Sequence, residues 1–230
     1  MRLKESLDHL IGTYPAGLKI AFDSWDLEEK GVLIINGWEN FPRWTPRILV
    51  VSNHQTMMDQ FFLIPLFAYQ YFFRPFKYGP WTMADRKNFY DNPRFRRVRS
   101  RIIPVRRDRV DVASLKMAVD ALERGESVIV FPEGGRTRSA PEGTNLLRSE
   151  VFGKEMRPLK SGFVCLAQIP GVVVLPIWTD NTSKSQFEMT AGSRVRLTIG
   201  QVMKFTKEDR VKDVIFSVGE RLLNLADQAG

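Results

Sequence analysis

Short apolar runs alternate with amphipathic stretches along most of this chain. Seven runs rich in β-branched and other apolar residues predict strands, at 31–36, 47–52, 81–84, 101–105, 127–131, 172–178 and 194–200. Between them, apolar positions at helical spacing predict helices at 59–72, 87–98, 110–124, 161–169 and 208–227. This alternation indicates an α/β fold, with a mostly parallel or mixed sheet of about seven strands flanked by helices.

The first 26 residues predict a helical arm that precedes this sheet. Its apolar positions lie on one side of a helix and are interrupted at Pro15-Ala16-Gly17. An arm of this kind either packs on the core or lies in a bilayer interface, and the sequence favours neither. We therefore expect an arm over 1–30 and a single domain over 31–230, in which residues 139–158 form a long loop over the active face.

No stretch of the sequence predicts a transmembrane helix. The longest apolar run, 61–73, contains Pro65 and Gln70 and is shorter than the ~20 residues that a spanning helix needs. The N-terminal residues lack the apolar core of a signal peptide. The single cysteine, Cys165, fits a reducing compartment and is expected as a small core residue. We expect a cytoplasmic protein that is peripheral on the inner face of the cell membrane.

Most of the positive charge is concentrated in one segment. The formal net charge is +8, and residues 94–109 contribute +7 of it through eight arginines and one aspartate. Such a cluster is either a solvated helical face with structural ion pairs or a site for phosphate groups on a substrate, a carrier or an anionic membrane. Nucleic acid is not expected as a partner, because only Phe95 is available for base stacking and no nucleic-acid-binding motif accompanies the cluster.

The first candidate for chemistry follows the strand predicted at 47–52. His54, one of two histidines, lies in the expected turn, and Asp59 follows five positions later. If Asp59 lies in the first turn of the next helix, its carboxylate can reach the imidazole, fix its tautomer and leave the other nitrogen free to accept a proton. The alternative is a buried histidine bonded to nearby backbone. His54 and Asp59 would supply only two metal ligands, and the sequence has no cysteine cluster, so a metal site is not predicted.

A second polar turn follows the strand predicted at 127–131. It reads Phe131-Pro132-Glu133-Gly134-Gly135-Arg136-Thr137-Arg138-Ser139. The glycines allow backbone amides to approach an anion, and the arginines can bind phosphate oxygens. The turn lacks the Gly-Lys-Ser/Thr ending of a P-loop. By itself it predicts either a phosphate-binding turn or a structural hairpin.

Four sequence blocks, in order over about residues 47–178, resemble the glycerolphosphate and lysophosphatidic acid acyltransferase family. His54-x4-Asp59 is similar to the first block, and Phe131–Arg136 to the third. Ile103–Arg107 is similar to the second block, with Arg107 at its arginine position, and Val173–Ile177 to the fourth. In the third block Gly135 replaces the family's usual threonine, while Arg136 keeps its position and Arg138 follows as a second arginine able to share its role.

The resemblance implies that a fatty acyl group moves from an acyl-CoA or acyl carrier protein thioester to a hydroxyl of a lysophospholipid such as 1-acylglycerol-3-phosphate, without another cofactor. It implies that His54 is the general base, held by Asp59, with Thr56 or nearby amides at the oxyanion. It implies a substrate-binding set consisting of Arg107, Glu133, Gly134, Gly135, Arg136 and Arg138. The expected partners are the thioester donor, the lysophospholipid acceptor and an anionic membrane surface.

Apolar residues near the first block predict a channel for the acyl chain, with simple core packing as the alternative: Met57, Met58, Phe61, Phe62, Phe67, Tyr71, Phe72 and Phe73. Three rival functions stay open. They are a hydrolase in which His54 activates water, an acyltransferase for another hydroxylated lipid or metabolite, and a non-enzymatic protein that binds anionic lipid or nucleic acid.

Overall fold

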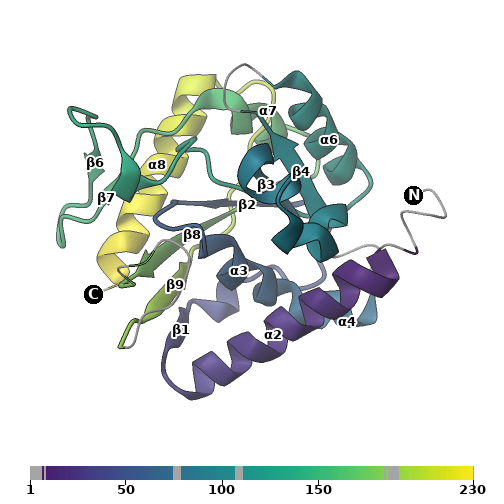
Figure 1. Cartoon of the computed structure of the whole chain (residues 1–230). Helices are drawn as coiled ribbons and strands as arrows, with labels where there is room; N and C mark the ends of the chain where they lie inside the picture. Colours follow the sequence, from purple (N-terminus) through teal and green to yellow (C-terminus); the bar gives the residue numbers. More distant parts are fainter. Residues whose placement is uncertain are drawn as a thin grey trace.

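A computed structural model of the chain describes residues 7, 9–74, 79–106, 111–183, 185 and 192–229 (Figure 1). In this part of the chain a seven-stranded sheet has the order β1-β9-β8-β2-β5-β3-β4. Its strands are β1 (Leu33–Asn36), β2 (Ile48–Ser52), β3 (Trp81–Asp85), β4 (Ile102–Val105), β5 (Val128–Val130), β8 (Val173–Asn181) and β9 (Val195–Ile199). Among the strand pairs of this sheet in the described residues, β8–β9 is antiparallel and the others are parallel. The predicted α/β fold with a mixed sheet is confirmed.

The strand β2 lies at the centre of the sheet, between β8 and β5. In the register, Val50 is opposite Leu175 on β8 and Ile129 on β5. All five β2 residues are buried, because helices cover both faces of the sheet. This explains why the central strands appear in the sequence as continuous apolar runs rather than as alternating ones.

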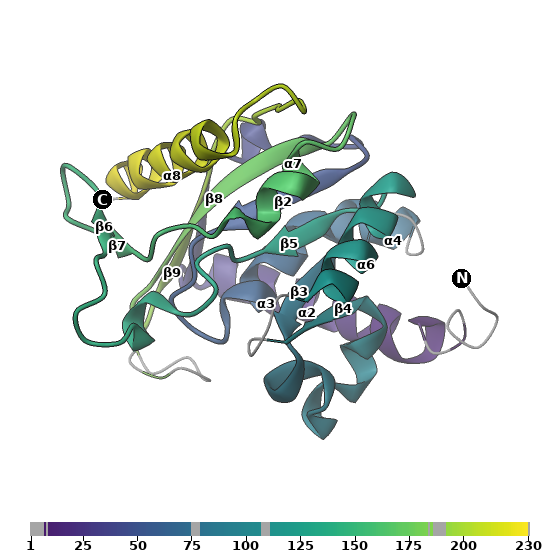
Figure 2. The ribbon, with the colours of Figure 1, turned by 90° about the horizontal axis from the view of Figure 1, so that it is seen from above.

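Helices cover the two faces of the sheet (Figure 2). One face packs against α6 (Val112–Glu123), α7 (Val164–Ala167) and α8 (Val211–Gln228). The other packs against α3 (Asp59–Leu63) and the segment η3 (Ile64–Phe67), with α2 (Tyr14–Glu29) and α4 (Ala68–Phe73) outside them. The side chain of Asp111 caps α6 by accepting a hydrogen bond from the Ser114 N–H at 3.2 Å.

Prolines divide two of the predicted helices into shorter segments. The helix expected over 59–72 is interrupted by the 3₁₀ segment η3, which contains Pro65. The helix expected over 87–98 becomes the short segments η4 (Arg86–Tyr90) and η5 (Pro93–Arg101), with Pro93 at the start of the second. The long loop expected over 139–158 contains a small hairpin of β6 (Leu147–Arg148) and β7 (Glu155–Met156). Cys165 is exposed on α7, so its expected place in the core is wrong.

The described part of the N-terminal arm packs on the domain along one side. It consists of η1 (His9–Thr13) and α2, and η1 lies against η5, where the Thr13 hydroxyl donates to the Arg97 carbonyl at 2.6 Å. The other side exposes apolar side chains, namely Leu10, Ile11, Phe22 and Trp25. No helix in the described residues combines the length and apolar character that crossing a membrane requires.

Candidate active site

The turn between β2 and α3 brings His54 and Asp59 into contact. His54 follows the end of β2, and Asp59 is the first residue of α3. The distance from His54 Nδ1 to Asp59 Oδ2 is 3.0 Å, so the expected contact between imidazole and carboxylate is present. Asn53 fixes the exit of the strand, because its side-chain amide forms two hydrogen bonds with the main chain of Thr179 on β8.

The Asp59 carboxylate is fully buried and accepts hydrogen bonds from the turn that precedes it. The backbone N–H groups of Gln55 and Thr56 donate to Oδ2 at 2.6 and 2.9 Å. The Thr56 hydroxyl donates to Oδ1 at 2.7 Å. These donors therefore hold Asp59 in place, and neither the hydroxyl nor the amides are left for a substrate oxyanion. The expectation that Thr56 stabilises the oxyanion does not fit this geometry.

The contact with Asp59 assigns different roles to the two ring nitrogens of His54. Because an ionised carboxylate only accepts hydrogen bonds, Nδ1 carries the proton and Nε2 presents a lone pair. The Phe131 ring stacks on the imidazole, with 4.4 Å between the ring centroids. His54 is thus held in the tautomer and orientation that a general base requires.

Glu133 joins this turn to the second polar turn. Its carboxylate accepts hydrogen bonds from the His54 N–H at 2.5 Å, from the Arg157 N–H at 2.7 Å and from the Thr137 hydroxyl. The side chain is buried, and this burial raises its pKa to about 7, although the three hydrogen bonds act in the opposite direction. Glu133 therefore serves contacts within the protein, and substrate binding by it stays a prediction.

The two glycines of the second turn allow side chains from residues 157–160 to approach closely. Gly134 has a φ of 67°, and a β-carbon there would lie 2.6 Å from Nζ of Lys160. A β-carbon on Gly135 would collide with Nη1 of Arg157. The sequence predicts that these glycines admit an anion to the backbone, whereas the structure shows that they admit two cations to the turn.

The arginines of the second turn have different surroundings. The Arg138 guanidinium donates to the carbonyls of Asn181 and Ser183 and to Gln55 Oε1, so it ties the turn to the end of β8. Arg136 is half-buried. Arg107 lies outside the described residues. Phosphate binding by these three arginines stays a prediction.

A cavity of about 580 Å³ opens beside His54, at the carboxyl ends of β3, β4 and β5. Ligand sites of open α/β sheets occur at this edge. Among the described residues, the cations that line the cavity are Arg106 and Lys160, and the acids are Asp85 and Asp111. Sequence reasoning missed Lys160. A signal was present, since Lys160-Ser161-Gly162 connects the loop over the active face to the helix expected at 161–169.

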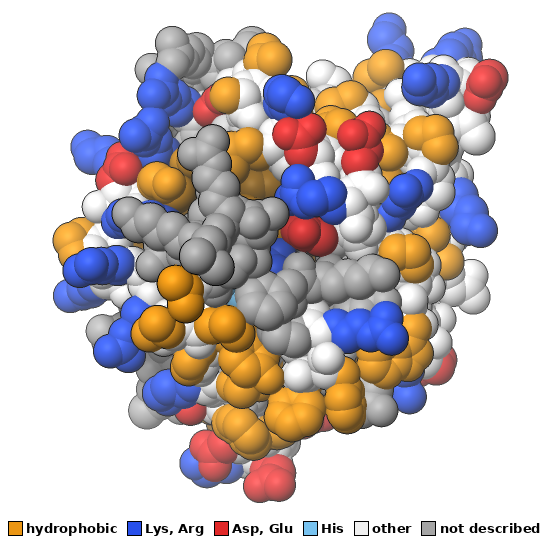
Figure 3. Space-filling model, turned by 90° about the vertical axis from the view of Figure 1, so that its right-hand side faces the viewer, with side chains coloured by type: hydrophobic (Ala, Val, Ile, Leu, Met, Phe, Trp, Pro, Cys, Tyr) orange, Lys and Arg blue, Asp and Glu red, His pale blue; other side chains and the backbone are white. Residues whose placement is uncertain are grey.

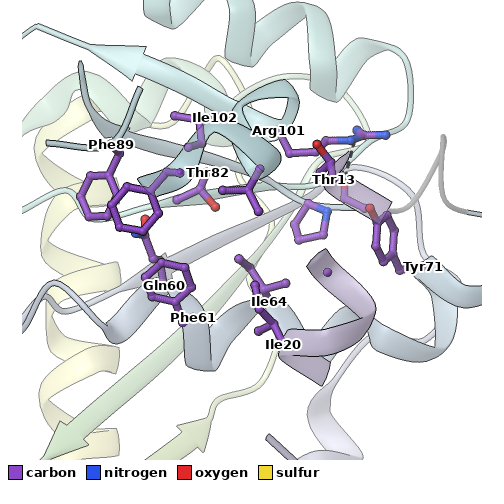
Figure 4. Close-up of a pocket in the computed structure, with 15 residues that line it drawn as sticks. Thr13, Ile20, Gln60, Phe61, Ile64, Tyr71, Thr82, Phe89, Arg101 and Ile102 are labelled. Atoms are coloured by element: carbon purple, nitrogen blue, oxygen red, sulfur yellow. Dashed lines mark hydrogen bonds between the residues drawn. The ribbon is translucent and has the colours of Figure 1, made fainter. Parts of the chain in front are cut away.

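A second, narrow cavity of about 40 Å³ lies on the other side of β3, between the sheet and the arm (Figure 4). Its lining is mostly apolar, and Gln60 and Phe89 line both this cavity and the larger one. Of the residues predicted to form an acyl channel, only Phe61 and Tyr71 line it. The others do not line this cavity: Met57, Phe62 and Phe67 are core, Met58 packs against the core, and Phe72 and Phe73 are exposed.

The arginine cluster is divided among several environments. Arg101 is buried, pairs with Glu126 at 3.1 Å and lies over the Trp81 ring at 5.0 Å. Arg99 lies over the Tyr90 ring. Arg94, Arg96 and Arg97 are exposed on η5, and Arg106 is at the cavity. The ion pair and the exposed arginines both belong to the first reading of the sequence, a solvated face with structural ion pairs, and a phosphate site in this segment stays a prediction.

Metal ligation is not indicated by the described residues. They contain no group of three or more histidine, cysteine, aspartate or glutamate side chains placed to hold an ion.

Comparison with known proteins identifies relatives of this chain. It is 28% identical over 175 residues to the 1-acyl-sn-glycerol-3-phosphate acyltransferase BAT2, chloroplastic, of Brassica napus, which is 73% of this chain and 42% of the relative. It is 28% identical over 172 residues to the 1-acyl-sn-glycerol-3-phosphate acyltransferase LPAT1, chloroplastic, of Arabidopsis thaliana, with 73% and 40% covered. The aligned region thus spans less than half the length of these relatives.

The fold also matches a solved structure, that of the 1-acyl-sn-glycerophosphate (LPA) acyltransferase PlsC from Thermotoga maritima. The TM-score is 0.61 at 20% sequence identity, with 99% of this chain and 84% of that chain covered. The family model described as Acyltransferase matches residues 33–180, which include the sheet from β1 to β8 and both polar turns. This chain belongs to the acyltransferase family.

Proposed function

We propose that this protein is an O-acyltransferase that moves a fatty acyl group from an acyl thioester to a hydroxyl of a lysophospholipid such as 1-acylglycerol-3-phosphate. The observation that carries the proposal is the contact between His54 and Asp59 at the edge of a cavity whose lining includes Arg106 and Lys160. The names of the two plant relatives and of the solved structure support the same acceptor class. Donors are acyl-CoA or the acyl carrier protein thioester, and the reaction needs no further cofactor.

In the proposed reaction, His54 acts directly on the acceptor. Its Nε2 takes the proton of the acceptor hydroxyl as that oxygen attacks the thioester carbonyl carbon. Asp59 stabilises the imidazolium that forms. The tetrahedral intermediate then breaks its carbon–sulfur bond, and the imidazolium gives the proton to the departing sulfur. The products are an ester and a free thiol, and the enzyme returns to its starting state.

The narrow apolar cavity is the candidate site for the end of the acyl chain. It lies next to the larger cavity, since Gln60 and Phe89 belong to both linings. A chain that passes from the thioester near His54 would go between these two residues toward Phe61 and Tyr71 (Figure 4). Apolar lining in a site of this kind stabilises a bound alkyl chain by removing it from water.

We further propose that the side carrying the arm lies on an anionic membrane surface. Figure 3 shows hydrophobic side chains gathered on this side, with Lys and Arg side chains around them. The exposed apolar residues come from η1, α2 and α4, and the exposed arginines of η5 are next to η1. Apolar area combined with basic charge is typical of proteins that bind anionic bilayers. We propose the inner face of the cell membrane as this surface, whereas the two plant relatives are named as chloroplastic proteins.

Mass spectrometry of the products tests the reaction. Purified protein would be incubated with acyl-CoA or acyl carrier protein thioesters and a panel of lysophospholipids, monoacylglycerols and other hydroxylated lipids. We expect wild type to form a diacyl phospholipid from a phosphate-bearing acceptor. The His54→Ala variant should form no product, while its circular dichroism spectrum should match that of wild type and show that it is folded. Near-normal turnover of His54→Ala would contradict the mechanism.

The same experiment separates the rivals. A hydrolase would release free fatty acid at the same rate with and without an acceptor. A non-enzymatic lipid-binding protein would form no ester, and its salt-sensitive binding to anionic vesicles would survive His54→Ala.

Membrane binding is tested by vesicle flotation of the Phe72→Ser/Phe73→Ser variant. Phe216→Ser, which changes an exposed phenylalanine on α8, is the control.

A further inference from the structure

We propose that Lys160 is a specificity-determining residue that binds the phosphate of the acyl acceptor above the Gly134-Gly135 turn. This inference rests on the proposed function and names a contact within the same site. It starts from the close approach of the Lys160 side chain to Gly134, where Nζ and Cε both lie 2.6 Å from the position of a β-carbon.

Main-chain hydrogen bonds fix the position of Lys160 relative to the turn. The segment 157–160 is bound at both ends, because the Arg157 N–H donates to Glu133 at 2.7 Å and the Lys160 N–H donates to the Pro132 carbonyl at 2.9 Å. Leu159, between them, is buried in the core. The backbone of Lys160 therefore belongs to the hydrogen-bond network that also holds His54. The Lys160 side chain lies across the Gly134-Gly135 turn.

The Lys160 ammonium is available to a ligand. Its side chain is exposed and lines the cavity together with His54, Gly134 and Gly135. No hydrogen bond or ion pair joins it to another of the described residues. Arg138, by contrast, is bound to main-chain carbonyls of Asn181 and Ser183. The cavity thus presents an ammonium close to the proposed general base, and a phosphate is the substrate group that such a cation binds.

The position of the cation favours the phosphate of the acceptor over that of the thioester donor. Glu133, adjacent to Gly134, accepts a hydrogen bond from the backbone N–H of His54, and Phe131 of the same turn stacks on the imidazole, so the turn under Lys160 lies beside His54. In a glycerol phosphate the reacting hydroxyl and the phosphate are on adjacent carbons. In a coenzyme A or carrier-protein thioester, the whole pantetheine arm separates the thioester from the nearest phosphate.

Steady-state kinetics of Lys160→Met and Lys160→Arg test this proposal. For Lys160→Met we expect the KM for 1-acylglycerol-3-phosphate to rise about 10- to 100-fold, since one charged contact is lost. The KM for the donor should stay within about twofold, and Lys160→Arg should recover much of the loss because it keeps the charge. Lys212→Met, which removes an exposed lysine on α8, is the matched control and should behave as wild type.

A binding measurement distinguishes failure of this inference from failure of the proposed function. Calorimetry with glycerol 3-phosphate should show weaker binding to Lys160→Met than to wild type and to Lys212→Met, whether or not acyl transfer is detected. Equal binding to all three, no binding to wild type, or a rise in the donor KM instead of the acceptor KM would overturn the assignment. Absence of acyl transfer together with loss of binding in Lys160→Met would reject the reaction while keeping the phosphate contact.

Discussion

The backbone N–H of His54 donates a 2.5 Å hydrogen bond to Oε1 of Glu133, which joins two turns that are separated by 79 positions in the sequence. A second bond runs the other way, from the Thr137 N–H to the His54 carbonyl at 2.7 Å. The main chain of the proposed general base is therefore held on both sides by the second turn. Its side chain is held by Asp59, so backbone and imidazole have separate supports.

Replacing Glu133 by glutamine should lower kcat more than it changes KM. The glutamine cannot accept all three hydrogen bonds, so His54 shifts, and small displacements of a catalytic group cost about 10- to 100-fold in rate. Steady-state kinetics with the acceptor varied would measure both constants. Thr137→Val is the comparison, since it removes one donor and keeps the carboxylate. A rise in the acceptor KM at unchanged kcat would instead place Glu133 among the substrate-binding residues.

The variant Asp59→Asn should lose about 10³- to 10⁴-fold in kcat, because an amide at this position no longer fixes the Nδ1–H tautomer of His54. Kinetics give the loss, and nitrogen NMR of the imidazole gives the tautomer. Thr56→Val is the control, since it removes only one of the donors to Asp59. A loss below tenfold, with the tautomer unchanged, would show that Asp59 has no such role.

The raised pKa of Glu133 predicts a particular dependence of stability on pH. Burial raises the pKa from 4.5 to about 7, so the folded protein retains a proton that the unfolded chain releases above about pH 4.5. The contribution of this group to the free energy of unfolding is therefore largest below pH 4.5, falls through the interval up to about pH 7, and is constant above it. The full fall would be about 3 kcal/mol.

Urea unfolding of wild type and Glu133→Gln at several pH values between about 4.5 and 8 would measure this dependence. The free energy of unfolding of wild type, relative to the variant, should decrease as the pH rises. A relative stability that is flat or increases with pH would mean that the three hydrogen bonds keep the carboxylate ionised throughout.

Removing Glu126 should destabilise the protein without altering the chemistry. Glu126 and Arg101 form a buried ion pair whose side chains are 11% and 7% exposed, and Glu126→Ala removes the carboxylate that pairs with the buried arginine charge. We expect the free energy of unfolding to fall by about 3–5 kcal/mol, and kcat of the folded enzyme to be unchanged. Asp23→Ala, which breaks the exposed pair with Lys19, should cost less than about 1 kcal/mol. Equal costs for the two variants would contradict this account.

The fold class and the first half of the site follow from the order of residues along the chain. Buried parallel strands need continuous apolar runs, so β2, β5 and β8 are visible in the chain, and the polar turns at their carboxyl ends are visible with them. The contact between His54 and Asp59 is local, because five residues span a strand-to-helix turn. A local contact of this kind follows from the expected elements alone. Pro65 and Pro93 are also visible in the sequence, but the apolar periodicity around them predicted continuous helices at 59–72 and 87–98.

The role of each polar side chain depends instead on contacts between segments that are distant in the sequence. Glu133, Arg138 and Arg101 carry charges that could bind a substrate, but each contacts a distant segment of the protein. Glu133 accepts from the His54 N–H, Arg138 donates to the end of β8, and Arg101 pairs with Glu126. Lys160 lies outside the four sequence blocks, and its side chain reaches the cavity because its backbone is hydrogen-bonded to the second turn. A buried polar group must be satisfied by whatever the fold places beside it, and that neighbour is set by packing across the sheet rather than by spacing along the chain.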